Sequence, residues 1–249
     1  EEPNFLIAAP PRPMAGIVNK TDFPYDASIS DANAGTIKDI VSDIYPLNRA
    51  LVSDGIDQAF DLIRKRLQAS TACTLETYPP TKPVWTWRIP ERFIVHEPYI
   101  ELEDGTKIAN VKENPLHLVS YSTALDKQMD WEELKNHLHT SEKRPHAVPW
   151  EFKYYERGWG FCLSKDEYDS LPRDQKYHAV INANYDVSAE TGLRTLSAVI
   201  DPIGEKNERM GEVLVTTHMC HPNMANDDAS GVAVAVEIAK RLHKKPLPQ

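Results

Sequence analysis

The sequence predicts an α/β protein in which a mixed sheet is flanked by helices and carries a small inserted β-rich domain. Apolar residues recur with helical spacing within 36–67, and short strand-like segments separated by turn residues occupy 75–160. A third observation is the apolar segment 212–217, which a short loop joins to a predicted helix over 230–242. A buried strand, a loop and a long helix form the βα step of an α/β sheet.

Two amphipathic helices are predicted before residue 68. The first carries apolar residues at positions i, i+3, i+4 and i+7 of one face, namely Ile37, Ile40, Val41 and Ile44. A break over 45–49 separates it from the second helix, whose candidate N-cap is Asp54. The apolar residues of the second helix repeat with the same spacing as far as Leu67. Both helices therefore have one face suited to packing.

The β-rich part is predicted from alternation and turn residues. Alternating residues predict strands over 84–89 and 116–121, and the two tryptophans of the first segment, Trp85 and Trp87, are expected in the core. Residues 99–108 predict a hairpin, because their Asp-Gly dipeptide permits the positive φ of a tight turn. Further elements are predicted as a short helix over 131–138 and strands over 177–185 and 193–200.

These elements predict four parts of the chain. Residues 1–34, rich in Pro, Ala and Asp without a sustained period, predict an extended arm. Residues 35–75 begin the main domain, 76–158 form the inserted β-rich domain, and 159–249 continue the α/β domain. Proline clusters mark the connections, because proline fixes φ and removes a hydrogen-bond donor. The arm could exchange with a neighbouring copy, which would give a homo-oligomer.

Composition excludes several classes of partner. The 249 residues carry a net charge of −9, which argues against a nucleic-acid surface, since phosphate binding needs clustered Lys and Arg. No apolar run approaches the roughly 20 residues that span a bilayer, so no membrane partner is expected. The chain begins without the basic-then-apolar order of a signal peptide, although a signal could have been removed. Three widely spaced cysteines form no disulfide framework, so we expect a cytoplasmic protein.

The loop between the predicted strand 212–217 and the following helix carries the candidate chemistry. His218 would lie at the strand tip and offer an imidazole nitrogen, while Asp227 would offer a carboxylate at the helix entry. Zinc binds both ligand types at about 2.0–2.2 Å, and one carboxylate can bridge two metals. Gly231 would allow the helix to pack closely on the sheet, and Ser230 or Asp228 could cap it. The alternatives are a core histidine at 218 and, for Asp228, a simple N-cap.

A strand that ends in His and is followed by Asn-Asp-Asp-Ala-Ser-Gly at 226–231 resembles the di-zinc aminopeptidases related to glutamate carboxypeptidases. The resemblance implies an aminopeptidase-like fold of the phosphorylase/hydrolase type, with two zinc ions in the complete site. It implies that His218 binds one zinc and that Asp227 bridges both ions. A bacterial subgroup with an inserted small domain and a C-terminal winged helix is similar from Thr36 onward, through phrases at 45–49, 87–90, 114–119, 154–162 and 217–222.

The sequence departs from the family's pattern in two respects. Cys220 stands where the family has the Asp of a His-x-Asp pair, so another group must hold the His218 tautomer. Cys220 and Ser230 are expected near the ligands rather than on the metal. His221 could serve as a ligand or as a supporting donor, and Asp228 is a further candidate ligand. The chain also ends at Gln249, before the family's remaining ligands and its Glu general base, so it is expected to be a fragment that is inactive alone.

The resemblance implies a zinc-dependent amide or peptide hydrolase that acts next to a free amino terminus. Its expected partners are a peptide or aminoacyl-amide substrate and the remaining C-terminal portion of the same protein. One alternative is a non-catalytic binding or scaffold protein of the same fold, because fold does not dictate function. Another alternative is a biosynthetic amidase or deacylase, which would keep the chemistry and change the substrate.

Overall fold

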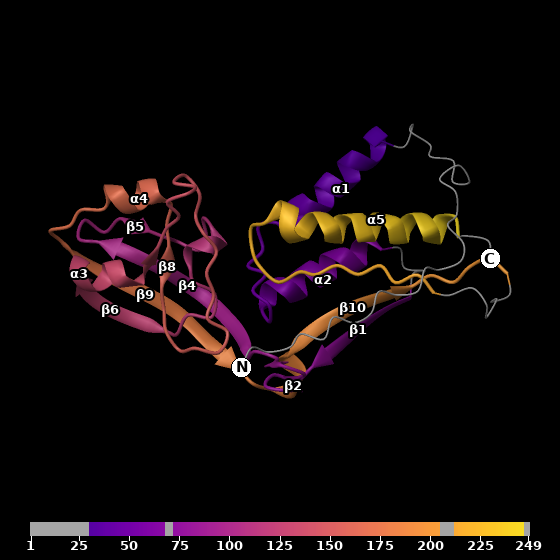
Figure 1. The fold of residues 1–249 in the computed structure, drawn as a ribbon, viewed down its shortest axis with the longest axis horizontal. Helices are drawn as coiled ribbons and strands as arrows, with labels where there is room; N and C mark the ends of the chain where they lie inside the picture. Colours follow the sequence, from indigo (N-terminus) through magenta and orange to yellow (C-terminus); the bar gives the residue numbers. More distant parts are fainter. Residues whose placement is uncertain (1–29, 68–71, 205–211, 247–249) are drawn as a thin grey trace, which may run out of the picture.

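The computed structural model describes residues 30–67, 72–204 and 212–246. Its fold is mixed α/β, with helices and small sheets arranged in two units (Figure 1). One unit packs α1 (Ser30–Ile44), α2 (Asp54–Arg66) and α5 (Ser230–Lys244), and the other is β-rich. A two-stranded ribbon of β1 (Ala72–Tyr78) and β10 (Leu193–Val199) joins the two units.

The helical unit confirms the predicted amphipathic helices. The packed faces of α1, α2 and α5 share one apolar core, made of Ile40, Ile44, Ala59, Ile63, Leu67, Ala229, Val232, Ala233 and Val236. Helix α1 begins at Ser30, so residues 30–34 of the predicted arm are helical, whereas 1–29 lie outside the described residues. Helix α5 confirms the predicted helix over 230–242.

The N-cap of α2 is Ser53, so the prediction of Asp54 was wrong by one residue. Ser53 has an extended backbone, with φ −155° and ψ 166°, and its hydroxyl accepts a hydrogen bond from the Ile56 amide at 3.4 Å. The Asp54 carboxylate instead accepts a hydrogen bond from Arg92 Nε at 3.1 Å. A serine hydroxyl satisfies an otherwise unpaired N–H of the first turn, which leaves the aspartate for an ion pair.

The ribbon is antiparallel along its whole length. Its register runs from Ala72 opposite Val199 to Tyr78 opposite Leu193, which confirms the predicted strand over 193–200. Gly192 precedes the second strand, and a Cβ there would lie 1.8 Å from the carbonyl oxygen of Tyr78. Only glycine therefore allows the two backbones to approach this closely where the ribbon meets the β-rich unit.

The β-rich unit is built on a four-stranded antiparallel sheet in the order β5-β4-β9-β6. The strands are β4 (Arg92–Leu102), β5 (Lys107–Ile108), β6 (Leu125–Asp130) and β9 (Lys176–Asp186). The predicted hairpin is confirmed between β4 and β5, with Gly105 at φ +82°. Strand β9 confirms the prediction over 177–185 and pairs with both β4 and β6, so this unit draws on residues from both sides of position 158.

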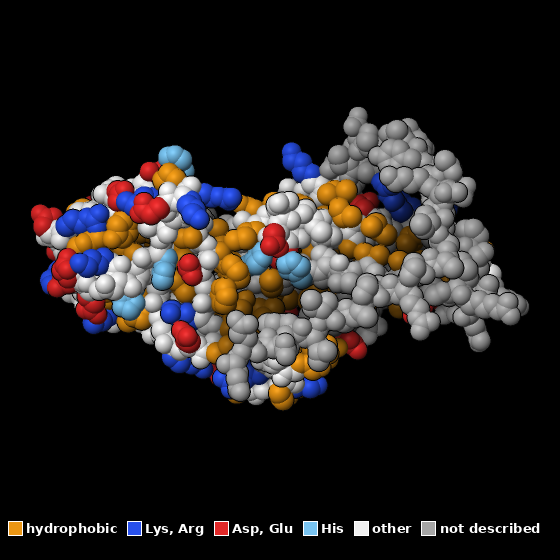
Figure 2. All heavy atoms as spheres, viewed as in Figure 1, with side chains coloured by type: hydrophobic (Ala, Val, Ile, Leu, Met, Phe, Trp, Pro, Cys, Tyr) orange, Lys and Arg blue, Asp and Glu red, His pale blue; other side chains and the backbone are white. Residues whose placement is uncertain are grey.

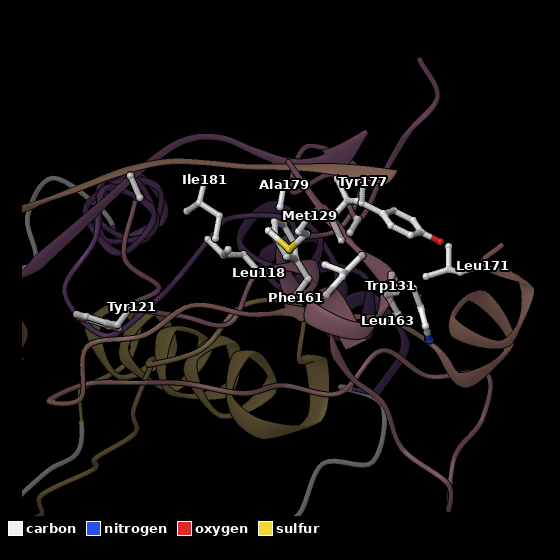
Figure 3. Packing of buried hydrophobic residues seen from close by; sticks show 14 of the residues in the cluster. Leu118, Tyr121, Met129, Trp131, Phe161, Leu163, Leu171, Tyr177, Ala179 and Ile181 are labelled. Carbon is white, nitrogen blue, oxygen red and sulfur yellow. The ribbon is translucent and has the colours of Figure 1, made fainter. Parts of the chain in front are cut away.

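Loops and short helices cover the sheet and close its core (Figure 3). Phe93 stacks on Tyr121 with ring centroids 5.1 Å apart, and Leu118, Met129, Phe161, Tyr177, Ala179 and Ile181 are among the other buried members. Strand β7 (Leu138–His139) pairs in parallel with β8 (Phe161–Cys162). The remaining helices are α3 (Trp131–Leu134), α4 (Lys165–Ser170) and the 3₁₀ turns Pro115–His117, Lys135–His137 and Ala189–Thr191. The helix predicted over 131–138 is thus one α-turn followed by a 3₁₀ turn.

Two predicted strands of this unit were wrong. Residues 84–89 form no single strand, because β2 (Pro83–Val84) turns through Trp85 into β3 (Trp87–Arg88). Trp85 has φ 49° and is fully exposed, and Trp87 is 38% exposed, so neither belongs to the expected core. Residues 116–121 form part of a 3₁₀ turn followed by isolated bridges. Alternation alone does not separate a strand from a turn that buries every second residue.

The predicted strand over 212–217 is also absent as regular structure. Val213 and Leu214 are 89% and 85% exposed, and the described chain has no strand pairing with this segment. A strand needs a neighbour that bonds its N–H and C=O groups, so an apolar sequence alone does not form one. The helical half of the predicted βα step is therefore present without its strand. Among the described helices, none is long and apolar enough to span a bilayer.

Candidate metal centre

The candidate metal loop, residues 218–229, lies at the N-terminal end of α5, on the side of the helix that faces the β-rich unit (Figure 1). Its last turn, Ala225–Ala229, is interrupted at Asp227, whose φ of −115° and ψ of 98° are not helical. Gly231 follows in the helix, and a Cβ there would lie 3.0 Å from Thr217 Oγ1. The absence of a side chain at Gly231 thus lets the start of the loop pass close to the helix.

The structure brings the predicted ligands His218 and Asp227 together. His218 Nε2 lies 3.3 Å from Asp227 Oδ1, and His221 Nε2 lies 3.6 Å from the same oxygen. The side chains of His218 and Asp227 are 63% and 69% exposed, whereas that of His221 is only 6% exposed. Histidine and acidic side chains gather near the middle of the face shown in Figure 2. One carboxylate oxygen therefore lies within 4 Å of two imidazole nitrogens.

These separations suit neighbouring ligands on one cation. Tetrahedral zinc with bonds of 2.0–2.2 Å holds adjacent ligand atoms about 3.3–3.6 Å apart. Both measured distances match this range, and imidazole nitrogen with carboxylate oxygen is a donor set that zinc accepts. His221 Nδ1 is buried and has no hydrogen-bond partner among the described residues. The residues thus fit a zinc-like ion at the Nε2 side of the two rings.

The loop also contains a second grouping. One ligand atom each from His218, Cys220 and Asp228 lie within 4.8 Å of one another. Cys220 Sγ is 3.5 Å from His218 Nδ1, and burial, with the nearby Asp228 and Asp227 carboxylates, raises the pKa of this thiol to about 11. Because the thiolate is the form that ligates metals, this grouping suits a cation less well than the Nε2 side.

Asp228 has a different place from the predicted N-cap. Its side chain is fully buried and forms an ion pair with the fully buried Arg49, with Oδ1 2.5 Å from Nη1. Its second oxygen, Oδ2, accepts a hydrogen bond from the Cys220 amide at 2.7 Å. The N-cap interpretation of Asp228 was therefore wrong, because both of its oxygens serve contacts outside the helix.

Ser230, the other predicted cap, also caps nothing. Its hydroxyl donates to the Asn226 carbonyl oxygen at 2.7 Å, and the N-cap of α5 is Ala229, which makes no side-chain hydrogen bond. The interrupted turn at Asp227 explains this result, because it already supplies part of the backbone bonding at the helix entry. Ser230 thus braces the end of the loop.

Sequence reasoning missed three residues around the loop. Arg49 was noted only as part of the phrase 45–49, yet it is the partner of Asp228. Trp150 packs on His221 with ring centroids 4.8 Å apart, and Asn114 Oδ1 accepts a hydrogen bond from Asn223 Nδ2 at 2.8 Å. A charged residue in the short connection between two amphipathic helices is a signal that could have drawn attention to Arg49. Asn114 was noted only as part of the phrase 114–119, and nothing in the local sequence marks Trp150.

The chain is similar to known proteins in both sequence and structure. Residues 92–184 match the model of a domain of unknown function, DUF2172. A curated Clostridium acetobutylicum protein, provisionally described as a polysaccharide biosynthesis protein with an aminopeptidase-like domain, is 32% identical over 215 residues. The match covers 86% of this chain and 46% of the relative, so the chain spans about half the length of the curated relative that it matches.

The chain also has structural matches. A 2.37 Å crystal structure of a provisionally assigned peptidase from Clostridium acetobutylicum matches with a TM-score of 0.76 and 31% identity, covering 86% of this chain and 47% of that one. A Bacillus subtilis zinc aminopeptidase, BSAP, matches at 13% identity and a TM-score of 0.44, covering 85% of this chain and 58% of that one. Over 86% of its length, the chain is therefore similar to a protein described as having an aminopeptidase-like domain and to a solved protein provisionally assigned as a peptidase.

Proposed function

We propose that the natural protein containing this chain is a zinc-dependent amide or peptide hydrolase that acts next to a free amino terminus. The observation that carries this proposal is the position of Asp227 Oδ1, 3.3 Å and 3.6 Å from the Nε2 atoms of His218 and His221. The likeness to aminopeptidase-like relatives supports the same chemistry. Bound zinc would lower the pKa of a coordinated water towards about 7 and polarise the scissile carbonyl.

The residues of this chain would have different roles at the site. His218 and Asp227 are exposed and would meet the substrate side, and the proposal gives each of them a metal-binding role. His221 is buried against Trp150 and would supply the more fixed nitrogen. A complete catalytic site needs three protein ligands and a water on each zinc, together with a general base.

Zinc titration of the metal-free natural protein tests the site. The variants His218→Ala and His221→Ala should each lower zinc affinity by about 100-fold or more, since each removes a direct ligand. The matched control is His146→Ala, which removes another histidine–aspartate contact, that with the exposed Asp166. The control should bind zinc as the wild type does. Unchanged affinity in both loop variants would refute the site.

Activity is tested separately with aminoacyl-amide and peptide libraries, with and without a chelator. The proposal expects cleavage that the chelator abolishes and that added zinc restores. A folded protein that takes up no zinc and cleaves nothing would instead favour the non-catalytic scaffold. Titration thus separates the enzyme from the scaffold before any substrate is known.

A second candidate is a biosynthetic amidase or deacylase of the same fold. It is favoured by the description of the curated relative, which links an aminopeptidase-like domain with polysaccharide biosynthesis. The two candidates share the metal chemistry and differ in the group that carries the amide. A panel of N-acylated sugars beside the aminoacyl-amides distinguishes them, because chelator-sensitive release of the acyl group from sugars alone would select the second candidate.

A further inference from the structure

The buried carboxylate of Asp228 lies near both histidines of the candidate site. Asp228 Oδ1 is bound by Arg49, and Oδ2 accepts from the amide of Cys220, which lies between the two histidines in sequence. The same Oδ2 is 4.0 Å from His218 Nδ1 and 3.8 Å from His221 Nδ1. Both rings therefore lie between two carboxylates, with Nε2 near Asp227 and Nδ1 near Asp228.

We propose that Arg49 and Asp228 act as a positioning pair for the metal site. Asp228 orients both imidazoles, and Arg49 holds Asp228 in place. This inference rests on the proposed zinc site, because an imidazole that gives Nε2 to a cation must carry its proton on Nδ1. Asp228 Oδ2 is the carboxylate oxygen nearest to that side of both rings, at 4.0 Å and 3.8 Å, and a carboxylate is the usual support of a metal-binding histidine. Cys220, the neighbour of His218 Nδ1, offers only a thiol for this purpose.

Arg49 is well placed to hold the carboxylate still. Its Nε donates to the Ile44 carbonyl oxygen at 3.0 Å at the end of α1, and its side chain is fully buried. The backbone of the preceding residue, Asn48, packs closely against α2. A Cβ on Gly55 would lie only 2.1 Å from the Asn48 carbonyl oxygen. The guanidinium is thus anchored to the packed helices, so it transmits their rigidity to the loop.

The charges explain why the pair acts as a unit. Within the buried site neither ion has water to replace its partner, so removing one partner leaves an uncompensated charge. In Arg49→Met the lone carboxylate would draw the loop towards solvent and pull both rings away from Asp227. In Arg49→Met with Asp228→Asn no charge is left buried, so the fold should recover, but neither ring then has a carboxylate at Nδ1.

Zinc affinity and stability should therefore separate in these variants of the natural protein. Arg49→Met should lower the stability of the protein. It should also lower zinc affinity by about 10- to 100-fold, which is the typical effect of removing a residue that supports a metal ligand. Arg49→Lys, which keeps the charge, should retain most of the affinity. The double variant should regain stability while its zinc affinity stays low. The control, Arg66→Met with Asp43→Asn, removes another ion pair of the helical unit and should leave affinity unchanged.

Wild-type zinc affinity in the double variant, once its stability has returned, would overturn the inference, because the pair would then serve only the fold. Wild-type affinity in Arg49→Met would also overturn it. Amide exchange in the metal-free protein gives a readout that needs no zinc. Exchange at Cys220 and along 218–229 should be slow in the wild type and fast in Arg49→Met, with the control unchanged.

The exchange readout also separates this inference from the proposed function. A wild type that binds no zinc would refute the hydrolase, and exchange would still decide on the pair. Exchange that rises more along 218–229 than in the three helices would support the positioning of the loop. Exchange along 218–229 that is unchanged, or that rises no more than in the helices, would overturn it.

Discussion

The contact between Tyr121 and Val52 ties the two units together and gives a prediction with a defined magnitude. The Val52 amide donates to the Tyr121 hydroxyl at 3.0 Å, and both residues are almost fully buried. Tyr121→Phe keeps the ring, which stacks on Phe93, and removes only the acceptor. The buried N–H would lose its partner, which costs about 1–3 kcal/mol of the free energy of unfolding. No cavity term adds to this figure, because the ring volume hardly changes.

Urea unfolding followed by circular dichroism measures the effect. With a denaturant slope of about 3 kcal/mol per molar, the expected loss lowers the midpoint by about 0.3–1 M. The matched control is Tyr155→Phe, whose hydroxyl donates to the Arg88 carbonyl oxygen at 2.6 Å at an exposed position. Water can replace that bond, so the control should lose less than about 0.5 kcal/mol. Equal small losses in both variants would refute the idea that this buried amide depends on Tyr121.

Four further predictions follow from burial and backbone geometry. Burial raises the pKa of the Cys162 thiol to about 12, so at pH 8 it should react with a disulfide reagent only after unfolding, whereas the half-buried Cys73 reacts first. Because this pKa is raised in the folded state, its stabilising contribution is complete below about pH 9 and is lost as pH rises towards about 12; urea midpoints should fall over this range, and less steeply in Cys162→Ala. Gly55→Ala should lower the thermal midpoint more than Gly105→Ala, since a Cβ would meet backbone at 2.1 Å in the first case and nothing within 4 Å in the second, and equal shifts would contradict the packing. Trp85→Ala should change the free energy of unfolding, measured with urea, by less than about 0.5 kcal/mol, because the ring is fully exposed. A larger loss would show that the ring is packed.

Elements that are stabilised by short-range patterns were predictable from sequence. Helix α2 has a cap, an apolar face and basic residues in its last turn, and the hairpin around Gly105 has the dipeptide that its turn requires. The segment 212–217 was not predictable in this way, because a strand depends on a partner that the segment itself does not encode. Trp85 failed for a related reason, since a turn at positive φ broke the alternation that indicated a strand.

In the candidate site, too, the local features were predicted from sequence and the long-range contacts were not. The closeness of His218 and Asp227 was predicted from a single loop, and the structure places their polar atoms 3.3 Å apart. Arg49 lies 179 residues from its partner Asp228, and a contact over that separation leaves no periodic trace in the sequence. The same is true of Trp150, which reaches His221 from the other unit. Local chemistry was therefore foreseeable, whereas the buried groups that hold it in place were not.

The ribbon of β1 and β10 has a consequence for how this architecture could have arisen. Tyr78 and Leu193 lie opposite each other, so the chain leaves the helical unit and returns to it at nearly the same point. Everything between them is, topologically, one very long hairpin loop, and the entropy of closing such a loop grows only slowly with its length. During evolution the segment between Tyr78 and Leu193 could therefore be gained, lost or exchanged without a change in the packing of the helices. Changes at Trp150 and Asn114 would be less tolerated, because these two residues contact His221 and Asn223 of the candidate metal loop.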